Sequence, residues 1–412
     1  MRTSAFAFAR DLRDEGVEAV LDNVRHRGRL DGVGLAVAYH DGRDVFPHNP
    51  RSRVGLLESG AIFFAPDPAV WVASELQPRV SELVQDGDPL AELLGRAAPL
   101  GLDVHAWTVF LHNDELARRA PACAQENAFG DRDPGTLCPA QPAVRDYVRR
   151  LVTDLAARRV TGIVAESLHY HPLEHGHAHE RYPVEIGALG RLLLGLCFCP
   201  ACCKAAEALG VDAAAVRAFA CATVDQRFAS GAAVDDSDAE LARDAVGALV
   251  EGALGDYLGM RETVVATLVA EAVASAGAVP ICFLDASGAA KGYWTGRPTG
   301  GSAASIAWRF GVELEAIAGA GAGILALAYA ADPGRVAFDL DDYAARAPEA
   351  ALACVLRPNR PDSETVQDLV AKLRVARSRG VETVHVYHYG LIRLEELDRI
   401  GFALEELEPR QS

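Results

Sequence analysis

PAVRDYVRRLVTDLAARRVTGIVAE, residues 142–166, joins an amphipathic segment directly to an apolar run that ends in a carboxylate. Within 142–159, one face of a helix carries the apolar side chains Val144, Tyr147, Val148, Leu151 and Leu155. The run 162–166 then has the length and composition of a buried strand. A strand that follows a helix this closely is typical of a parallel sheet with crossover helices.

Seven further β-like runs are separated by helical segments along the chain: 4–9, 33–40, 102–112, 279–285, 324–330, 352–357 and 383–389. Another clear helix is predicted over 363–379, where Val366, Leu369, Val370 and Leu373 form a stripe. Eight strand–helix units predict an α/β protein of one domain, a (β/α)₈ TIM barrel over residues 1–412. The alternative, a doubly wound open sheet, lacks a Gly-x-Gly-x-x-Gly element after its first strand.

The chain is longer than a typical barrel of about 250 residues. The additional residues lie mainly between the fourth and fifth strands, where residues 167–276 are predicted to form a long helical insertion containing a cysteine cluster. The sequence reads LCPA at 137–140 and CFCPACC at 197–203. Cys138, Cys197, Cys199 and Cys202 can supply four sulfur ligands to one Zn²⁺. Because a closed four-sulfur site has no open position, we expect this zinc to be structural.

Composition limits the partners of the chain. The formal net charge of −17 argues against nucleic acid and anionic membranes, since neither attracts an acidic surface. No apolar stretch of about 18 residues is present, so no membrane-spanning helix is expected. The N-terminus has no signal-peptide h-region, and the nine cysteines are then expected as reduced thiols in the cytoplasm. Homo-oligomer formation stays open.

In a barrel of this kind the active site lies at the C-terminal ends of the strands. These ends carry imidazoles, tyrosines and amides, which suit a neutral, polyhydroxylated small molecule. The predicted ligand contacts are Tyr39, His40, Trp107, His112, Asn113, His169, Tyr329, Arg357 and His388. His169 begins a stretch, 169–180, with five histidines, which is interpreted as a pocket-lining loop; a second metal site is the alternative.

Glu166 is the strongest catalytic candidate. A carboxyl group shielded at the mouth of a barrel can have a pKa high enough to donate a proton at neutral pH. Glycoside hydrolysis requires such a donor and usually a second carboxylate. Asp285, at the end of the fifth run, is the predicted partner. Asp362 is a further candidate, and helix N-capping is the alternative role for it.

The region 100–205 resembles the family 42 β-galactosidases. The resemblance rests on Leu137-Cys138-Pro139, the following helix, the strand ending in Glu166, and the Cys197-x-Cys199-x-x-Cys202 unit. It implies a glycoside hydrolase barrel with Glu166 as acid/base and the four cysteines as zinc ligands. The chain departs from the family at Ala165, where the family has Asn, and at the seventh strand end, which lacks the nucleophilic Glu.

These features predict an enzyme that hydrolyses a small glycoside or sugar-like substrate. Two other functions stay open. One is a sugar isomerase, epimerase or lyase on the same barrel. The other is a carbohydrate-binding barrel without catalysis.

Overall fold

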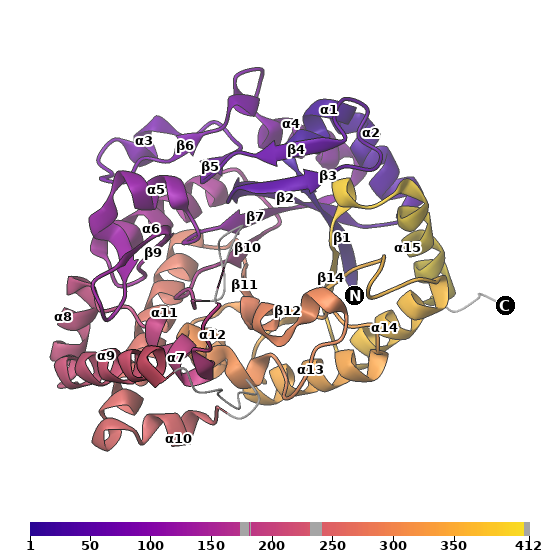
Figure 1. Ribbon diagram of the computed structural model, residues 1–412. Coiled ribbons are helices and arrows are strands. Elements are labelled where there is room, and N and C mark those ends of the chain that lie inside the picture. The colour runs from indigo at the N-terminus through magenta and orange to yellow at the C-terminus, as the bar shows by residue number, and fades with distance from the viewer. Residues whose placement is uncertain (174–180, 182, 231–240, 408–412) are drawn as a thin grey trace.

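The computed structural model describes residues 1–173, 181, 183–230 and 241–407, and its centre is a closed barrel of parallel strands (Figure 1). In spatial order the barrel strands are β1 (Arg2–Phe8), β2 (Gly32–Tyr39), β7 (Asp103–Val109), β10 (Gly162–Glu166), β11 (Ile281–Asp285), β12 (Gly323–Leu327), β13 (Leu352–Leu356) and β14 (Thr383–Val386). The first strand closes the barrel because it pairs with β14 on one side and with β2 on the other. The predicted TIM barrel is therefore confirmed.

Each of the eight predicted runs coincides with one barrel strand, and several strands end one to three residues before the predicted limit. The predicted run 102–112, for example, ends at Val109 as β7. The next two amides, of Phe110 and Leu111, still bond to carbonyls at the end of β10, but the Leu111 carbonyl accepts from Leu137 outside the barrel. The chain therefore leaves the barrel at a point that apolar composition alone does not mark.

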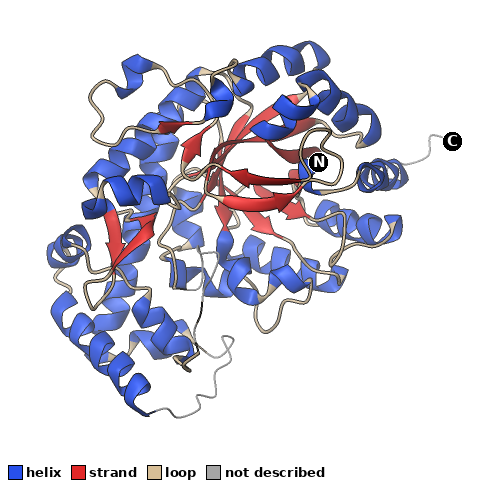
Figure 2. Cartoon of the chain, turned by 45° about the horizontal axis from the view of Figure 1, so that its top comes forward, coloured by secondary structure: helices blue, strands red, loops and turns tan. Residues whose placement is uncertain are grey.

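Helices cover the outside of the barrel (Figure 2). The main ones are α1 (Ala9–Glu15), α2 (Val17–Asp22), α4 (Pro89–Ala97), α6 (Pro142–Ala157), α11 (Ala253–Ala276), α12 (Leu314–Gly319), α13 (Pro333–Arg346), α14 (Val366–Ser378) and α15 (Leu394–Leu407). The predicted apolar faces of α6 and α14 are buried. Helix α14 begins after Thr365, whose side chain accepts from the Asp368 amide while the Asp368 side chain accepts from the Thr365 amide.

The connections at the C-terminal ends of the strands carry additional elements. After β2 come the hairpin β3 (Gly42–Val45) and β4 (Val54–Leu57), the short strands β5 (Ala61–Ile62) and β6 (Arg79–Val80), and helix α3 (Pro68–Trp71). After β7 come α5 (Asp114–Arg119) and the hairpin β8 (Ala124–Glu126) and β9 (Arg132–Leu137). Between β10 and α11 lie α7 (Gly187–Leu194), α8 (Pro200–Ala208), α9 (Ala213–Ser230) and α10 (Arg243–Gly247). In Figure 1 the helices α7 to α10 lie together at one side of the barrel.

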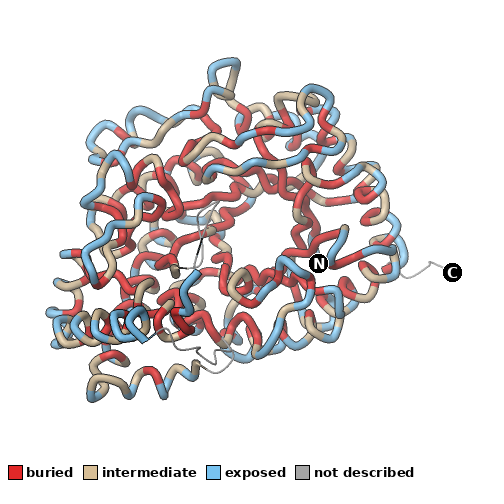
Figure 3. The backbone as a smooth tube through the Cα atoms, viewed as in Figure 1, coloured by how far each residue is buried: buried red, intermediate tan, exposed pale blue. Residues whose placement is uncertain are grey.

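The barrel wall is mostly buried, and exposure is concentrated on the outer faces of the helices, in the loops and on the hairpin β3–β4 (Figure 3). Large aromatic side chains fill the barrel interior. The ring of Phe6 stacks at 4.5 Å on Trp107 and at 4.8 Å on His385. Among the described residues, no helix is both long and apolar enough to span a bilayer.

Candidate active site at the C-terminal end of the barrel

Glu166 is the last residue of β10, and its carboxyl group is held by a side chain from the neighbouring strand. The indole Nε1 of Trp107 donates to Glu166 Oε2 at 2.6 Å. The strand register places Trp107 beside Val164, two residues before the acid, so the two side chains project on the same face of the sheet. Phe6 and the edge of Tyr39 pack against the indole, at ring separations of 4.5 and 4.8 Å. Packing therefore fixes the donor that orients Glu166.

The environment of Glu166 favours its protonated form. Burial raises the pKa of Glu166, and the nearby His40 and the hydrogen bond from Trp107 lower it in part. Three phenols lie close enough to feel the charge of Glu166: Tyr39, Tyr329 and Tyr387. A carboxyl group with a raised pKa among hydroxyl groups can donate a proton to a bound oxygen atom.

The three phenols line the barrel mouth from the end of β2, past β14, to the end of β12. Tyr39 donates a hydrogen bond to the hydroxyl of Tyr387, whose ring lies 6.0 Å from that of Tyr329. The guanidinium of Arg357 covers Tyr329, with Cζ 4.3 Å from the ring centre. Burial raises the pKa of each of these phenols, so they stay neutral and can donate hydrogen bonds to sugar hydroxyls.

Arg357 is held in place by a residue to which sequence reasoning assigned a different role. Its Nε and Nη2 donate to the two oxygens of Asp362, each at 2.7 Å. Of the two roles left open for Asp362, the capping of the following helix is wrong, since Thr365 is the N-cap of α14. The reason is that a buried arginine at the end of β13 requires a bidentate carboxylate.

A row of four imidazoles continues from the site toward the loop after β10. His40 stacks on His112 at 4.5 Å, His112 meets His171 at 5.1 Å, and His171 lies 5.4 Å from His169. His169 is fully buried, and burial lowers its pKa to about 4, so this imidazole is neutral at pH 7. The other histidines of the predicted loop (residues 175, 177 and 179) lie outside the described residues.

His388 lies behind the indole. Its ring is 4.0 Å from that of Phe8 and 5.9 Å from that of Trp107, and its Nδ1 accepts from the Gly390 amide. Burial lowers the pKa of His388 to about 3. The proton of this neutral ring is then on Nε2, which makes Nε2 a donor inside the barrel mouth.

Two of the predicted site residues have polar groups that are engaged elsewhere. Asn113 is the N-cap of α5, where its Oδ1 accepts from the Leu116 amide and its Nδ2 donates to the Gly60 carbonyl. Asp285 is fully buried, and its Oδ1 accepts from Ser287 while its Oδ2 accepts from Tyr343 of the outer helix α13. Both oxygens of Asp285 are therefore used within the fold, and this geometry favours a capping role for it.

The structure also brings Tyr387 to the mouth, where its hydroxyl lies close enough to feel the charge of Glu166. Tyr387 was included in the eighth predicted run but was not chosen as a site residue. Its position beside His388, at the end of a predicted strand, made it detectable from the sequence.

The four predicted metal ligands are brought together. The sulfurs of Cys138, Cys197, Cys199 and Cys202 all lie within 4.8 Å of one another, and all four residues are buried. Cys138 Sγ lies 3.4 to 3.8 Å from each of the other three. Four ligands at about 2.3 Å around a tetrahedral ion lie about 3.8 Å apart, so this cluster can hold a metal ion. No other such cluster occurs among residues 1–173, 181, 183–230 and 241–407.

The cysteine cluster contacts the loop that follows Glu166. The hydroxyl of Tyr170, four residues after the acid, lies 3.3 Å from Cys202 Sγ. The guanidinium of Arg261 lies over the Tyr170 ring, with Cζ 4.5 Å from its centre. A metal bound by the cysteines would therefore hold the start of the loop that leaves β10.

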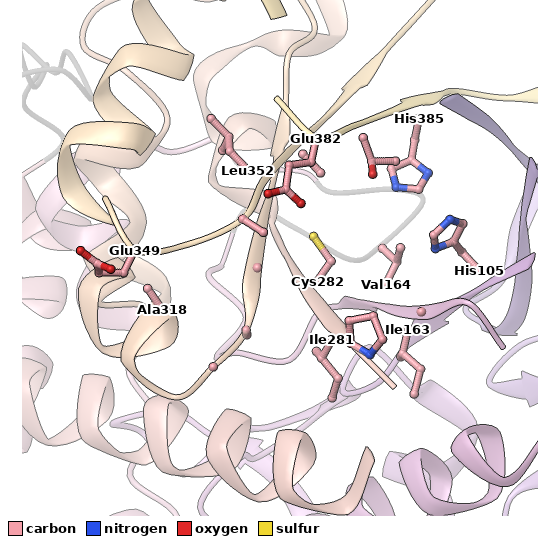
Figure 4. A pocket seen from close by; sticks show the side chains of 18 residues that line it. His105, Ile163, Val164, Ile281, Cys282, Ala318, Glu349, Leu352, Glu382 and His385 are labelled. Carbon is pink, nitrogen blue, oxygen red and sulfur yellow. The ribbon is translucent and has the colours of Figure 1, made fainter. Parts of the chain in front are cut away.

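A cavity of about 380 Å³ opens at the opposite end of the barrel. It is lined by the first residues of several strands, among them Gly162, Ile281 and Leu352, and Figure 4 shows His105 and His385 near each other in it. None of the predicted site residues lines this cavity. In TIM barrels the N-terminal face contributes to stability and the C-terminal face to chemistry, so we place the candidate site at the Glu166 end.

Comparisons with known proteins agree on the architecture. No family model and no curated sequence matches the chain. Among solved structures, α-L-fucosidase isoenzyme 2 from Paenibacillus thiaminolyticus aligns with a TM-score of 0.56 at 11% identity, over 99% of this chain and 49% of that one. The β-galactosidase of Halorubrum lacusprofundi aligns at 0.56 and 12% identity, over 100% and 59%. The catalytic domain of a Paenibacillus polymyxa β-amylase aligns at 0.54 and 10% identity, over 99% of both chains.

This chain spans about half to three fifths of the length of the fucosidase and the β-galactosidase. At these identities the similarity concerns the fold: the chain has a TIM barrel like those of several glycosidases. The resemblance to the family 42 β-galactosidases is thus supported as a distant structural similarity accompanied by a four-cysteine cluster.

Proposed function

We propose that the protein hydrolyses the glycosidic bond of a small carbohydrate, with Glu166 as the general acid. The observation that carries this proposal is the Glu166–Trp107 pair: a carboxyl with a raised pKa, oriented by a buried indole at the C-terminal end of a barrel strand. The glycosidase-like fold of the structural neighbours supports the same reaction class.

The surrounding residues suit a sugar ligand. The hydroxyls of Tyr39, Tyr329 and Tyr387 are neutral donors and acceptors near the acid. Trp294, which is 55% exposed and lies 6.2 Å from the ring of Tyr329, can stack on the apolar face of a sugar ring. Glu166 would protonate the leaving oxygen as the bond to the anomeric carbon breaks, so that the alcohol leaves uncharged.

We infer that the ion held by the cysteines is zinc, because four buried thiolates in tetrahedral spacing suit Zn²⁺. With four protein ligands, such an ion has no position for substrate. Its role would be to fix the Tyr170 region after β10, and through it the start of the loop beside the acid.

Glu166→Gln tests the proposal on a panel of glycosides that differ in leaving group. Gln keeps an acceptor for Trp107, so the variant should fold. For substrates with a poor leaving group we expect kcat/KM to fall about 10²- to 10⁴-fold. Dinitrophenyl glycosides, whose leaving group needs no protonation, should lose far less. Equal losses on both kinds of substrate, or no loss on either, would refute the assignment of the acid.

A second candidate, a sugar isomerase, epimerase or lyase, is favoured by the row of four imidazoles from His40 to His169. Such an enzyme could use a divalent ion near these rings. Activity lost in chelator, with the fold retained, and recovered with Mn²⁺ or Mg²⁺ would support this candidate. Hydrolysis that persists in chelator would support the glycosidase.

A further inference from the structure

The cavity at the N-terminal end of the barrel is large enough for a ligand. Its volume of about 380 Å³ lies within the range of small-molecule pockets. In TIM barrels, layers of mainly bulky, branched side chains fill the interior. Here four consecutive strands, β10 to β13, each contribute a small residue to the lining: Gly162, Cys282, Gly323 and Ala353. The space is open because these positions lack the side chains that would fill it.

Much of the cavity wall is apolar. Val164, Ile281 and Leu352 line it and are buried. Side chains around an unfilled space lose packing contacts, which lowers the stability of a fold. A ligand with an apolar body would supply these contacts, so the wall favours a ligand of this kind.

The charged side chains of the lining are both carboxylates. Glu349 and Glu382 are exposed at the cavity, and neither forms an ion pair with a described residue. Among the described residues that line the cavity, there is no lysine or arginine. Burial, together with the charge of Glu382, raises the pKa of the Cys282 thiol to about 12, so the thiol is neutral. The carboxylates therefore give the cavity a negative charge, which attracts a cation.

Two imidazoles complete the polar lining. His385 is 2% exposed, its Nδ1 lies 2.6 Å from Ser4 Oγ, and its Nε2 has no hydrogen-bond partner among the described residues. His105 lies 5.3 Å from His385 between ring centres, and its ring forms no hydrogen bond to that part of the chain either. Burial lowers the pKa of both imidazoles, so they are neutral at pH 7 and do not repel a cation. A neutral imidazole keeps one acceptor nitrogen, which His105 can offer to an N–H donor in the cavity.

We propose that this cavity binds a small protonated amine with an apolar body. The ammonium group pairs with the carboxylates at the mouth, and the body packs against Ile281 and Leu352. In Figure 4 the Glu382 carboxylate and the two imidazoles border the same space as the Cys282 thiol. One ligand can therefore contact the charged, polar and apolar parts of the lining together.

This cavity is separate from the candidate active site. The ring of His385 stacks on Phe6, and Phe6 stacks on Trp107, which donates to Glu166. These stacked rings occupy the barrel interior between the cavity and the acid. Binding of an amine at the cavity consequently does not depend on the proposed function.

The test is isothermal titration calorimetry with 2-phenylethylamine and its uncharged analogue 2-phenylethanol at pH 7. The wild-type protein should bind one amine per chain. The alcohol should bind about three- to tenfold more weakly, because it lacks the charge that pairs with the carboxylates. Glu382→Gln should weaken binding of the amine about two- to fivefold and leave binding of the alcohol unchanged. The control Glu207→Gln changes an exposed glutamate of α8 that forms no ion pair with a described residue, and it should bind both compounds like the wild type.

Two further variants locate the bound amine. Cys282→Phe places a large ring in the cavity and should abolish binding of both compounds, with circular dichroism as the check on folding. Glu166→Gln, at the other end of the barrel, should bind the amine with wild-type affinity.

Three results would each overturn the proposal. They are no binding of the amine at millimolar concentrations, equal affinities for the amine and the alcohol, and equal amine affinities in Glu382→Gln and Glu207→Gln. Weaker amine binding in Glu166→Gln would also overturn it, because the amine would then occupy the candidate active site. The comparison of Glu382→Gln with Glu207→Gln decides the question if Cys282→Phe does not fold.

Discussion

Trp107→Phe isolates the contribution of one hydrogen bond to the chemistry of Glu166. The substitution removes the indole N–H that donates to Oε2 at 2.6 Å and keeps an aromatic ring against Phe6. A hydrogen bond to a charged group contributes about 1.5–3 kcal/mol, and one to a neutral carboxyl about 1 kcal/mol. The difference, about 0.5–2 kcal/mol, is lost only from the ionised form.

The loss of this hydrogen bond determines the direction in which the pKa of Glu166 changes. The bond from Trp107 lowers the pKa of Glu166, so its removal raises that pKa further above the ordinary value. Since 1.4 kcal/mol corresponds to one pKa unit, the expected rise is about one unit. A general acid is active while protonated, and the basic limb of kcat/KM against pH reports its pKa in the free enzyme. We therefore expect this limb to move to higher pH by about one unit.

The assay is a pH–rate profile on one hydrolysable glycoside, with Trp71→Phe as the matched control. Trp71 is also buried, and its Nε1 donates to Asp154 Oδ2 at 2.9 Å on the outside of the barrel. Both substitutions lose a tryptophan–carboxylate bond and should lower stability by a few kcal/mol. Only Trp107→Phe should move the basic limb. An unmoved limb, or a shift to lower pH, would refute the proposal that Trp107 tunes a proton donor.

Two further predictions concern residues whose roles the fold specifies. Asp285→Asn should lower the free energy of unfolding by about 1–3 kcal/mol, because the hydrogen bonds from Ser287 and Tyr343 are weakened. The same variant should keep kcat near the wild-type value. A loss of kcat above about 100-fold with an unchanged fold would instead make Asp285 a catalytic carboxylate. Cys202→Ser should lower the zinc content below one ion per chain, measured by elemental analysis, and should lower the unfolding midpoint. The control Cys354→Ser changes a buried cysteine of β13 and should leave the zinc content at one ion per chain. An equal zinc content in both variants would contradict the four-cysteine site.

Much of the architecture was already determined by local patterns in the chain. The eight apolar runs alternate with helical stripes, and such alternation leads to a parallel barrel because each strand must be covered by the helix that follows it. The same alternation of apolar runs and helices predicts that Glu166 stands at the end of the fourth strand. The spacing Cys197-x-Cys199-x-x-Cys202 likewise predicted three members of the cluster, since neighbouring thiols on a loop and a helix start can reach one ion.

The directions of side chains at the strand ends were decided only by tertiary structure. Trp107 was predicted as a ligand contact, and the structure adds that its indole N–H donates to a carboxyl 59 residues away, because strands β7 and β10 are neighbours. Asp285, at the same kind of position as Glu166, turns outward to Tyr343 of α13. Sequence periodicity determines which residues form a strand, whereas the partner of a polar group depends on contacts between elements distant in the chain.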